Sequence, residues 1–313
     1  MLNRRLLRIK AFKVLYANEA SESQSLDAAC KTLLTSCEWT RNLYYFLLGV
    51  CPHLVQIAQD KIDSGKSKLR PTPEEASPNM KFVENEFVKL LVQDDKILNY
   101  CQKHGLGWAD NDIFLRKLFN SIISSDYYAE YMSSPKKSLK EDCKLFKRIF
   151  EEEFEDNQML EDILEEMSVF WIDDLEYTLN VVLRSIDSVS AGNGFNHPDV
   201  FLKEDDRDFA LRLLTACIQN YDEYAAIIAE KLVNWEPDRL VSTDCVLVIM
   251  GLAEAVAFPS IPVKVTINEY VEISKYYSIP KSRTFVNGLL DTIIQEKSAS
   301  GQIVKSGRGL FTE

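Results

Sequence analysis

Three arginines that can bind phosphate lie close together near the start of the chain, at Arg4, Arg5 and Arg8. The first thirteen residues contain no acidic residue, whereas the whole chain has a formal net charge of −12. A planar guanidinium can bond a phosphate through two N–H groups and stack on a base. On one helix these side chains would reach successive phosphates of a nucleic acid, although a basic, solvated helix face explains the same pattern.

A second group of candidate residues lies near the other end of the chain, at Lys281, Ser282 and Arg283. These residues stand at a predicted helix start, where free backbone N–H groups and the helix dipole favour an anion. Ser282 is explained equally well as a simple N-cap. The two added cations favour phosphate binding at this position.

Two aromatic residues, Tyr16 and Phe285, accompany these cations. An aromatic side chain at helical spacing usually belongs to the core. The alternative is that an exposed ring stacks on an unpaired base, a contact of about 1–3 kcal/mol.

No arrangement of residues predicts catalysis. The chain has no glycine-rich phosphate loop, no nucleophile elbow and no histidine placed for acid–base chemistry. The seven cysteines are scattered without a C-x-x-C pair, and the three histidines lie far apart. We therefore expect a protein that is not an enzyme, without metal or cofactor, whose thiols stay reduced in a cytoplasm. No uninterrupted apolar run is long enough to span a membrane, and no secretory signal follows the amino-terminal arginines.

The elements that position these residues are predicted to be helices, which makes the fold all-α. Glycine and proline are scarce, and apolar residues recur at helical spacing over long segments. The predicted helices cover residues 3–18, 25–36, 39–61, 81–103, 110–132, 138–154, 157–187, 209–233, 244–258, 264–277 and 282–295. Two segments without periodicity, 63–80 and 188–206, are predicted to be linkers.

Strongly acidic helix faces mark the middle of the chain, as at Glu151, Glu152 and Glu153. The simple interpretation is a solvated surface. The alternative is a docking face for a basic protein.

Short strings at both ends of the chain, in one order, resemble the NusB family of helical RNA-binding proteins. The first helix matches at Arg4, Arg5, Arg8, Ala11, Leu15 and Tyr16. Near the other end the matching residues are Trp235, Arg239, Leu240, Asp244, Leu247, Glu254, Ile261, Pro262, Val265, Ile267, Asn268, Glu269, Glu272, Lys275, Tyr277, Ser278, Ser282 and the run Phe285–Gly288. The resemblance covers roughly residues 3–18 and 207–296.

This resemblance implies two helical bundles whose shared edge binds RNA, with the turn before Phe285 beside the first helix. It also implies the partners: a single-stranded boxA-like RNA, the ribosomal small-subunit protein NusE, and the RNA polymerase antitermination complex on ribosomal RNA operons. The RNA-binding residues would be Arg4, Arg5, Arg8, Tyr16, Lys281, Ser282, Arg283 and Phe285. The predicted parts are an arginine-rich first helix (1–20), an inserted helical region (21–203), a NusB-like carboxy-terminal bundle (204–297) and a flexible tail (298–313).

The chain departs from the family pattern in three places. Leu6 interrupts the arginine run, and Lys281 stands where the family commonly has an acidic residue. The region between the first helix and Phe209 is much longer than the family requires. Two other functions stay open: a protein-binding scaffold whose arginines pair with acidic faces, and an accessory module like those of RNA methyltransferases. The absence of a Rossmann-type glycine loop counts against the second.

Overall fold

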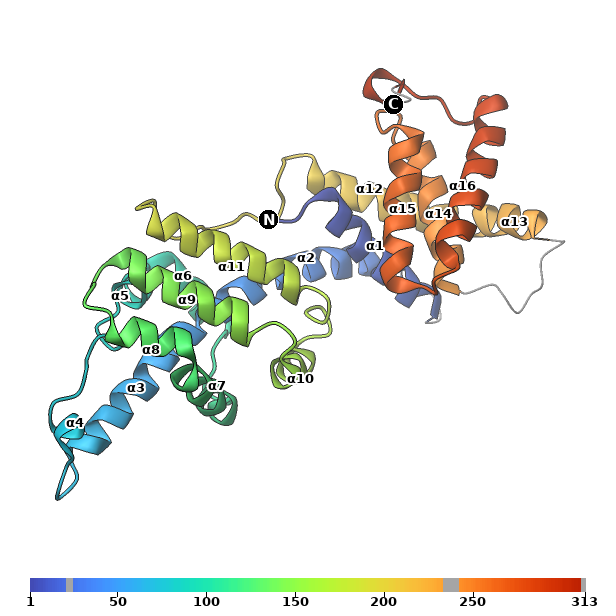
Figure 1. Cartoon of the computed structure of the whole chain (residues 1–313). Coiled ribbons are helices and arrows are strands. Elements are labelled where there is room, and N and C mark those ends of the chain that lie inside the picture. Colours follow the sequence, from blue (N-terminus) through green and yellow to red (C-terminus); the bar gives the residue numbers. More distant parts are fainter. Residues whose placement is uncertain (21–24, 233–241, 311–313) are drawn as a thin grey trace. The chain divides into compact units, whose positions relative to one another are not determined.

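The protein is built from helices, as the sequence predicts (Figure 1). The computed structural model describes residues 1–20, 25–232 and 242–310. Within these ranges there is no strand, and Leu2 and Phe201 form an isolated parallel bridge. The all-α prediction is confirmed. No helix in the described ranges is both long and apolar enough to cross a lipid bilayer.

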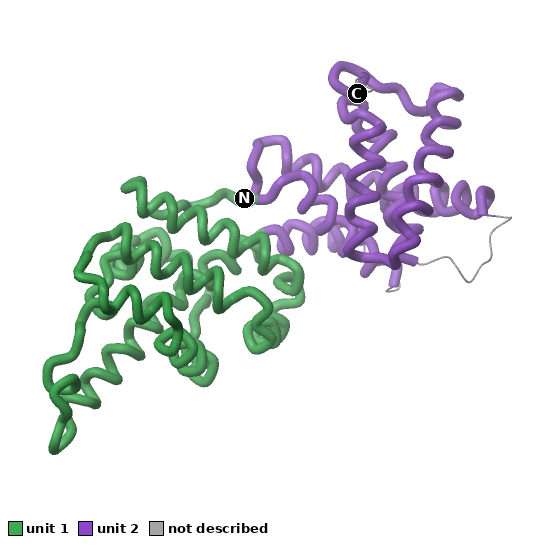
Figure 2. The backbone as a smooth tube through the Cα atoms, viewed as in Figure 1, with its two compact units in different colours: residues 1, 38–200 green, residues 2–37, 201–313 purple. Residues whose placement is uncertain are grey.

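The chain divides into two compact units, which Figure 2 shows in green and purple. Unit 1 comprises residues 1 and 38–200, and unit 2 comprises residues 2–37 and 201–313. The helix α2 (Leu26–Leu48) contributes its first part to unit 2 and its second part to unit 1. Of the region predicted at 21–203, residues 38–200 belong to unit 1, whereas residues 25–37 and 201–203 belong to unit 2.

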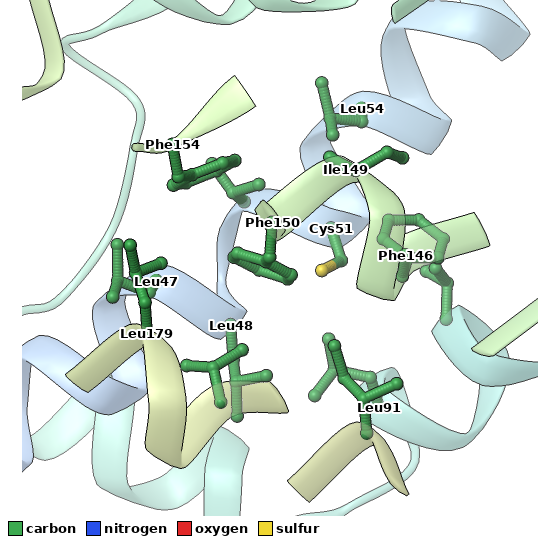
Figure 3. Close-up of a cluster of buried hydrophobic side chains, with 14 of the residues drawn as sticks. Leu47, Leu48, Cys51, Leu54, Leu91, Phe146, Ile149, Phe150, Phe154 and Leu179 are labelled. Carbon is green, nitrogen blue, oxygen red and sulfur yellow. The ribbon is translucent and has the colours of Figure 1, made fainter. Parts of the chain in front are cut away.

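Unit 1 packs around a large apolar core. Besides the end of α2 it contains α3 (Val50–Lys66), α4 (Pro73–Ala76), α5 (Glu86–Val92), α6 (Asp95–His104), α7 (Asp112–Ser124), α8 (Asp126–Ser133), α9 (Leu139–Glu153), α10 (Gln158–Met167) and α11 (Leu175–Ser190). Figure 3 shows part of this core, where Leu47 and Cys51 lie among Phe146, Phe150 and Leu179. The amphipathic helices bury one apolar stripe each, which is the main force that holds the unit together.

Several predicted helices are shorter in the structure because polar residues cap new helix starts within them. The region 81–103 forms α5 and α6, and the Asp94 carboxylate accepts from two backbone N–H groups at the start of α6. Ser125 likewise divides 110–132 into α7 and α8 by capping Tyr128. In contrast, no break occurs at residues 37–38, and α2 runs on to Leu48, where Gly49 precedes α3.

The two predicted linkers are only partly irregular. Residues 63–80 include the end of α3 and the short α4, whose capping box joins Thr72 and Glu75. The second linker is entered by α11, which ends at Ser190. The irregular segments are therefore shorter than the sequence predicts.

Unit 2 surrounds a central apolar helix. It contains α1 (Arg4–Ala20), α12 (Asp206–Gln219), α13 (Tyr221–Lys231), α14 (Ser242–Ala257), α15 (Val263–Tyr277), α16 (Ser282–Ala299) and the short 3-10 helix η2 (Gly307–Leu310). Helix α14 contacts α1, α12, α13, α15 and α16, which explains why it is apolar on all sides. The predicted helix 209–233 is two helices, α12 and α13, which meet at Asn220.

Helix α14 approaches α16 closely at Gly251. A Cβ atom added there would lie 2.6 Å from Cδ2 of Leu290, whose side chain is fully buried. The absence of a side chain at this position therefore sets the distance between the two helices.

The described residues after α16, within the tail predicted from residue 298, contact the end of α14. Ile303 is buried. The Lys305 ammonium donates to the backbone carbonyls of Ala255 (2.7 Å) and Phe258 (3.2 Å), at the carboxy-terminal end of α14. Burial lowers the pKa of Lys305. A lysine that satisfies the last carbonyls of a helix stabilises that helix end, a role that composition does not reveal.

We expect the thiols of Cys37, Cys51, Cys143 and Cys217 to resist modification in the folded chain. All four are buried, and burial raises the pKa of Cys143 to about 12. A thiol-specific colorimetric reagent at pH 8 should label these residues only after unfolding, because the thiolate is the reactive form. Cys30, which is less buried, is the internal comparison. Labelling of Cys51 as fast as that of Cys30 would contradict the packing.

Candidate nucleic-acid interface

The three arginines of α1 differ in how far they are buried in unit 2. Asn3 precedes the first residue of α1, and its side-chain oxygen accepts from the backbone N–H of Leu6 at 3.0 Å. Arg5 and Arg8 share Glu269, one oxygen of which lies 3.6 Å from Nη1 of Arg8, and Arg4 and Arg8 both stand over the ring of Phe209. Because their burial differs, the three predicted phosphate contacts are not equivalent.

Arg5 lies at the surface beside α15. Its Nε and Nη2 groups donate to the two carboxylate oxygens of Glu269, at 2.9 and 2.8 Å. Its side chain is half exposed. The hydrogen bond to Glu269 raises the pKa of Arg5. An exposed ion pair of this kind contributes little net stability, so a phosphate can compete with Glu269 for the guanidinium.

Arg8 lies inside unit 2, and the predicted phosphate contact does not fit this position. Its side chain is 4% exposed and donates through two nitrogens to Glu254, at 2.6 and 2.9 Å. Thr266 and Tyr270 donate their hydroxyl groups to the same carboxylate, at 2.9 and 3.1 Å. Burial lowers the pKa of Arg8, but the hydrogen bonds and charge of Glu254 outweigh this effect and raise it. We assign Arg8 to holding α1 against α14.

Arg4 lies between these extremes. It donates to Asp205 at 2.6 Å and to Asp206 at 3.1 Å. Its guanidinium carbon stands 4.8 Å from the ring centroid of Phe209. About a third of the side chain is exposed. These contacts join α1 to the start of α12, so a structural role competes with RNA binding at this residue.

Ser282 is buried and does not present its hydroxyl to solvent. It donates to one oxygen of Asp244 at 2.6 Å, and Ser278 donates to the other oxygen at 2.6 Å. Asp244 itself is buried at the start of α14. The anion that the sequence predicts at the start of α16 is therefore supplied by the protein, and a phosphate on Ser282 does not fit this geometry.

Lys281 and Arg283 flank Ser282 and are exposed. The structure records no ion pair for Lys281 among the described residues. Glu272 on α15 connects this end of the unit to α1. The hydrogen bond from Lys275 lowers the pKa of Glu272, and the charges of Arg5 and Arg283 lower it further. One carboxylate on α15 therefore lies within electrostatic reach of cations from both ends of the chain.

Aromatic side chains line the other end of α1. Tyr16 is 38% exposed, and its hydroxyl lies 3.3 Å from that of Ser242. Phe12 stands with its ring centroid 6.1 Å from Tyr16 and 5.4 Å from Tyr277. The middle of α1 therefore lies beside the end of α15. Phe285, the other predicted aromatic, is half-buried on the first turns of α16.

Two groups on this edge, the exposed Tyr276 and the partly buried Lys13, are absent from the sequence predictions. Tyr276 is 81% exposed at the end of α15. The ammonium of Lys13 stands 5.7 Å from the ring centroid of Tyr277. A lysine followed by two tyrosines, at Lys275 to Tyr277, is the sequence signal that could have identified this edge. We use the term cation–aromatic surface for Arg5, Tyr16, Tyr276, Lys281 and Arg283.

Comparisons with known proteins show which family the chain is similar to. The model of the NusB family matches residues 191–295. A transcription antitermination protein NusB of Chloroherpeton thalassium is 37% identical over 134 residues, which are 43% of this chain and 63% of that protein. The protein of the same name from Salinibacter ruber is 39% identical over 105 residues, which are 34% of this chain and 66% of its own length.

A third relative decides the family. The transcription antitermination protein NusB of Clostridium botulinum is 33% identical over 105 residues, and this chain covers 79% of its length. The chain belongs to the NusB family. It spans less than two thirds of each of the first two relatives. No solved structure matches the chain.

The resemblance read from the sequence is therefore confirmed at the level of the NusB family. The matched range 191–295 contains α12 to α15 and most of α16. Trp235, Arg239 and Leu240, which carry part of the resemblance, lie outside the described residues. Most of unit 1 precedes the matched range, so the family match itself assigns it no role.

Proposed function

We propose that this protein is an RNA-binding transcription antitermination factor. It binds a single-stranded boxA-like RNA of ribosomal RNA operons together with the ribosomal protein NusE, as part of an RNA polymerase antitermination complex. Membership of the NusB family supports this proposal. The structural observation that carries it is that unit 2 holds exposed cations from both ends of the chain, Arg5 on α1 and Lys281 and Arg283 at the start of α16.

RNA would bind on the cation–aromatic surface by replacing exposed ion pairs within the protein with contacts between its cations and RNA phosphates. A phosphate would replace Glu269 on Arg5 and gain a bidentate, charge-assisted contact. Lys281 and Arg283 would hold further phosphates. Tyr16 and Tyr276 offer exposed rings on which unpaired bases can stack. Phosphate contacts would position the strand, and stacking or base-edge contacts would select it.

The proposal predicts a specific loss of RNA affinity when exposed cations are removed. The variant R5A/K281A/R283A should bind a labelled twelve-nucleotide boxA-like RNA more weakly than the wild type. The slope of log affinity against log salt should fall by about 2, at about 0.7 for each phosphate of a single strand. Fluorescence anisotropy titrations at four salt concentrations, with and without purified NusE, measure both quantities.

The matched control removes three exposed cations from unit 1. K96A/K103A/K136A changes the net charge by the same amount, and all three residues are exposed. Its affinity and salt slope should stay close to those of the wild type. Equal weakening by both triple variants would indicate only non-specific attraction. An unchanged titration for R5A/K281A/R283A, with and without NusE, would favour a protein-binding scaffold instead.

A further inference from the structure

The negative charge of this chain is concentrated in one segment of unit 1. Residues 149–183 contain 12 acidic residues and no lysine or arginine. Outside this segment the 36 lysines and arginines are balanced by an equal number of acidic residues, so the segment accounts for the whole net charge of −12. A merely solvated helix face usually mixes both signs of charge.

Arg148 pairs with Glu152, and Tyr127 donates to Glu153, but other acidic residues of the segment stand at unfavourable helix positions. The last turns of α9 and α10 contain glutamates and no basic residue. Glu165 and Glu166 thus lie at the negative end of the α10 dipole, where cations are favoured and anions are not. External cations would relieve this repulsion.

An apolar loop lies between α10 and α11, and it is held in place (Figure 1). Trp171 is fully buried, and its indole N–H donates to the backbone carbonyl of Trp39 at 2.6 Å. The backbone N–H of Trp171 donates to the carbonyl of Ser168, and that of Asp174 donates to the carbonyl of Trp171, both at 3.0 Å. The loop is therefore fixed from within.

While Trp171 is buried in the core of unit 1, the apolar residues beside it in the loop face solvent. Val169 is 66% exposed, Ile172 is 48% exposed, and Met167 at the end of α10 is 36% exposed. Val and Ile are branched at Cβ and lose little rotamer freedom on binding. A fixed, exposed apolar group costs little ordering entropy when a partner covers it. We use the term acidic–apolar surface for Glu165, Glu166, Met167, Val169, Ile172 and Glu176.

We propose that the acidic–apolar surface binds a lysine- or arginine-rich segment of another protein, with at least one large apolar side chain of that segment on Val169 and Ile172. The charge selects this partner. Nucleic acid and anionic lipid carry phosphates that the acidic residues repel. In the part of the chain that the structure describes, no group of side chains could hold a metal ion. This binding does not depend on RNA binding by unit 2.

The test is a selection from a displayed library of random twelve-residue peptides against the full chain. Binders are counter-selected on V169S/I172S, which keeps every acidic residue. Selected peptides should be rich in lysine and arginine and contain a large apolar residue. One such peptide, labelled and titrated, should bind V169S/I172S at least tenfold more weakly than the wild type. Its affinity for the wild type should fall as salt rises, because the exposed charges are screened.

The control L69S/I113S replaces two other exposed apolar residues of unit 1, which are 98% and 72% exposed. It should bind the peptide like the wild type. Methyl NMR of the wild type should show shifts at Val169 and Ile172 on titration, which gives a readout independent of any variant. Selection of only neutral or acidic peptides, or of none that distinguishes V169S/I172S, would overturn the proposal. Concentration-dependent self-association that V169S/I172S abolishes would overturn it in favour of a second copy of this chain.

Discussion

Replacing Arg8 by alanine should lower the free energy of unfolding by about 3–5 kcal/mol. The substitution leaves the Glu254 carboxylate, which is fully buried, without the guanidinium that neutralises it. The hydroxyl groups of Thr266 and Tyr270 remain as donors but carry no charge. Urea denaturation followed by far-ultraviolet circular dichroism, under one buffer condition, measures the loss.

Two further variants separate the buried charge from its surroundings. R5A breaks an exposed ion pair on the same helix and should cost no more than about 1 kcal/mol. R8M/E254L removes both charges and should regain much of the stability lost in R8A, because no unpaired charge remains. If R8A differs from the wild type by less than R5A does, the buried pair does not hold α1 as we describe.

Replacing Trp171 by alanine should destabilise unit 1 by about 3–5 kcal/mol, the usual cost of removing a large buried aromatic side chain. Its ring is fully buried, with centroids 5.3 Å from Trp39 and 5.2 Å from Phe46. The substitution leaves a cavity and removes the indole hydrogen bond to the carbonyl of Trp39. Thermal unfolding monitored by circular dichroism should show a correspondingly lower midpoint.

The variant W171F keeps an aromatic ring and loses the indole N–H, so its cost should be smaller than that of W171A. The substitution L69A, at a side chain that is 98% exposed, should stay within about 0.5 kcal/mol of the wild type. Equal stability of W171A and L69A would mean that Trp171 does not fix the loop that presents Val169 and Ile172. The acidic–apolar surface would then lack its rigid support.

The locations of the candidate RNA-binding residues show where sequence patterns are sufficient and where they fail. Arg5, Lys281 and Arg283 are exposed, as a basic binding surface requires. Arg8 has the same residue type and lies on the same helix as Arg5, yet it is buried. A single sequence does not specify which side of α1 packs on α14. Nor does it specify that Glu254 of α14 pairs with Arg8.

A glutamate inside an apolar helix is the clue that could have identified the partner of Arg8. Glu254 lies in the run from Val246 to Ala257, which otherwise has no charged residue. A buried carboxylate requires hydrogen bonds and a cation. Several arginines of the chain could supply that cation. Only the structure identifies Arg8 as the partner of Glu254. The same holds for Asp244, which occupies the position at the start of α16 that the sequence assigns to a phosphate.

By itself, the sequence determined the helical class and the family, because helical periodicity and short ordered strings are local properties of a chain. It also located the charged segments, since charge is counted along the chain. The tertiary structure alone decided which of these charges are buried in pairs and which face solvent. It also divided the long predicted helices and packed the segment that contains Lys305. These outcomes depend on contacts between residues that are remote in sequence, and burial changes the energy of a charge more than its residue type does.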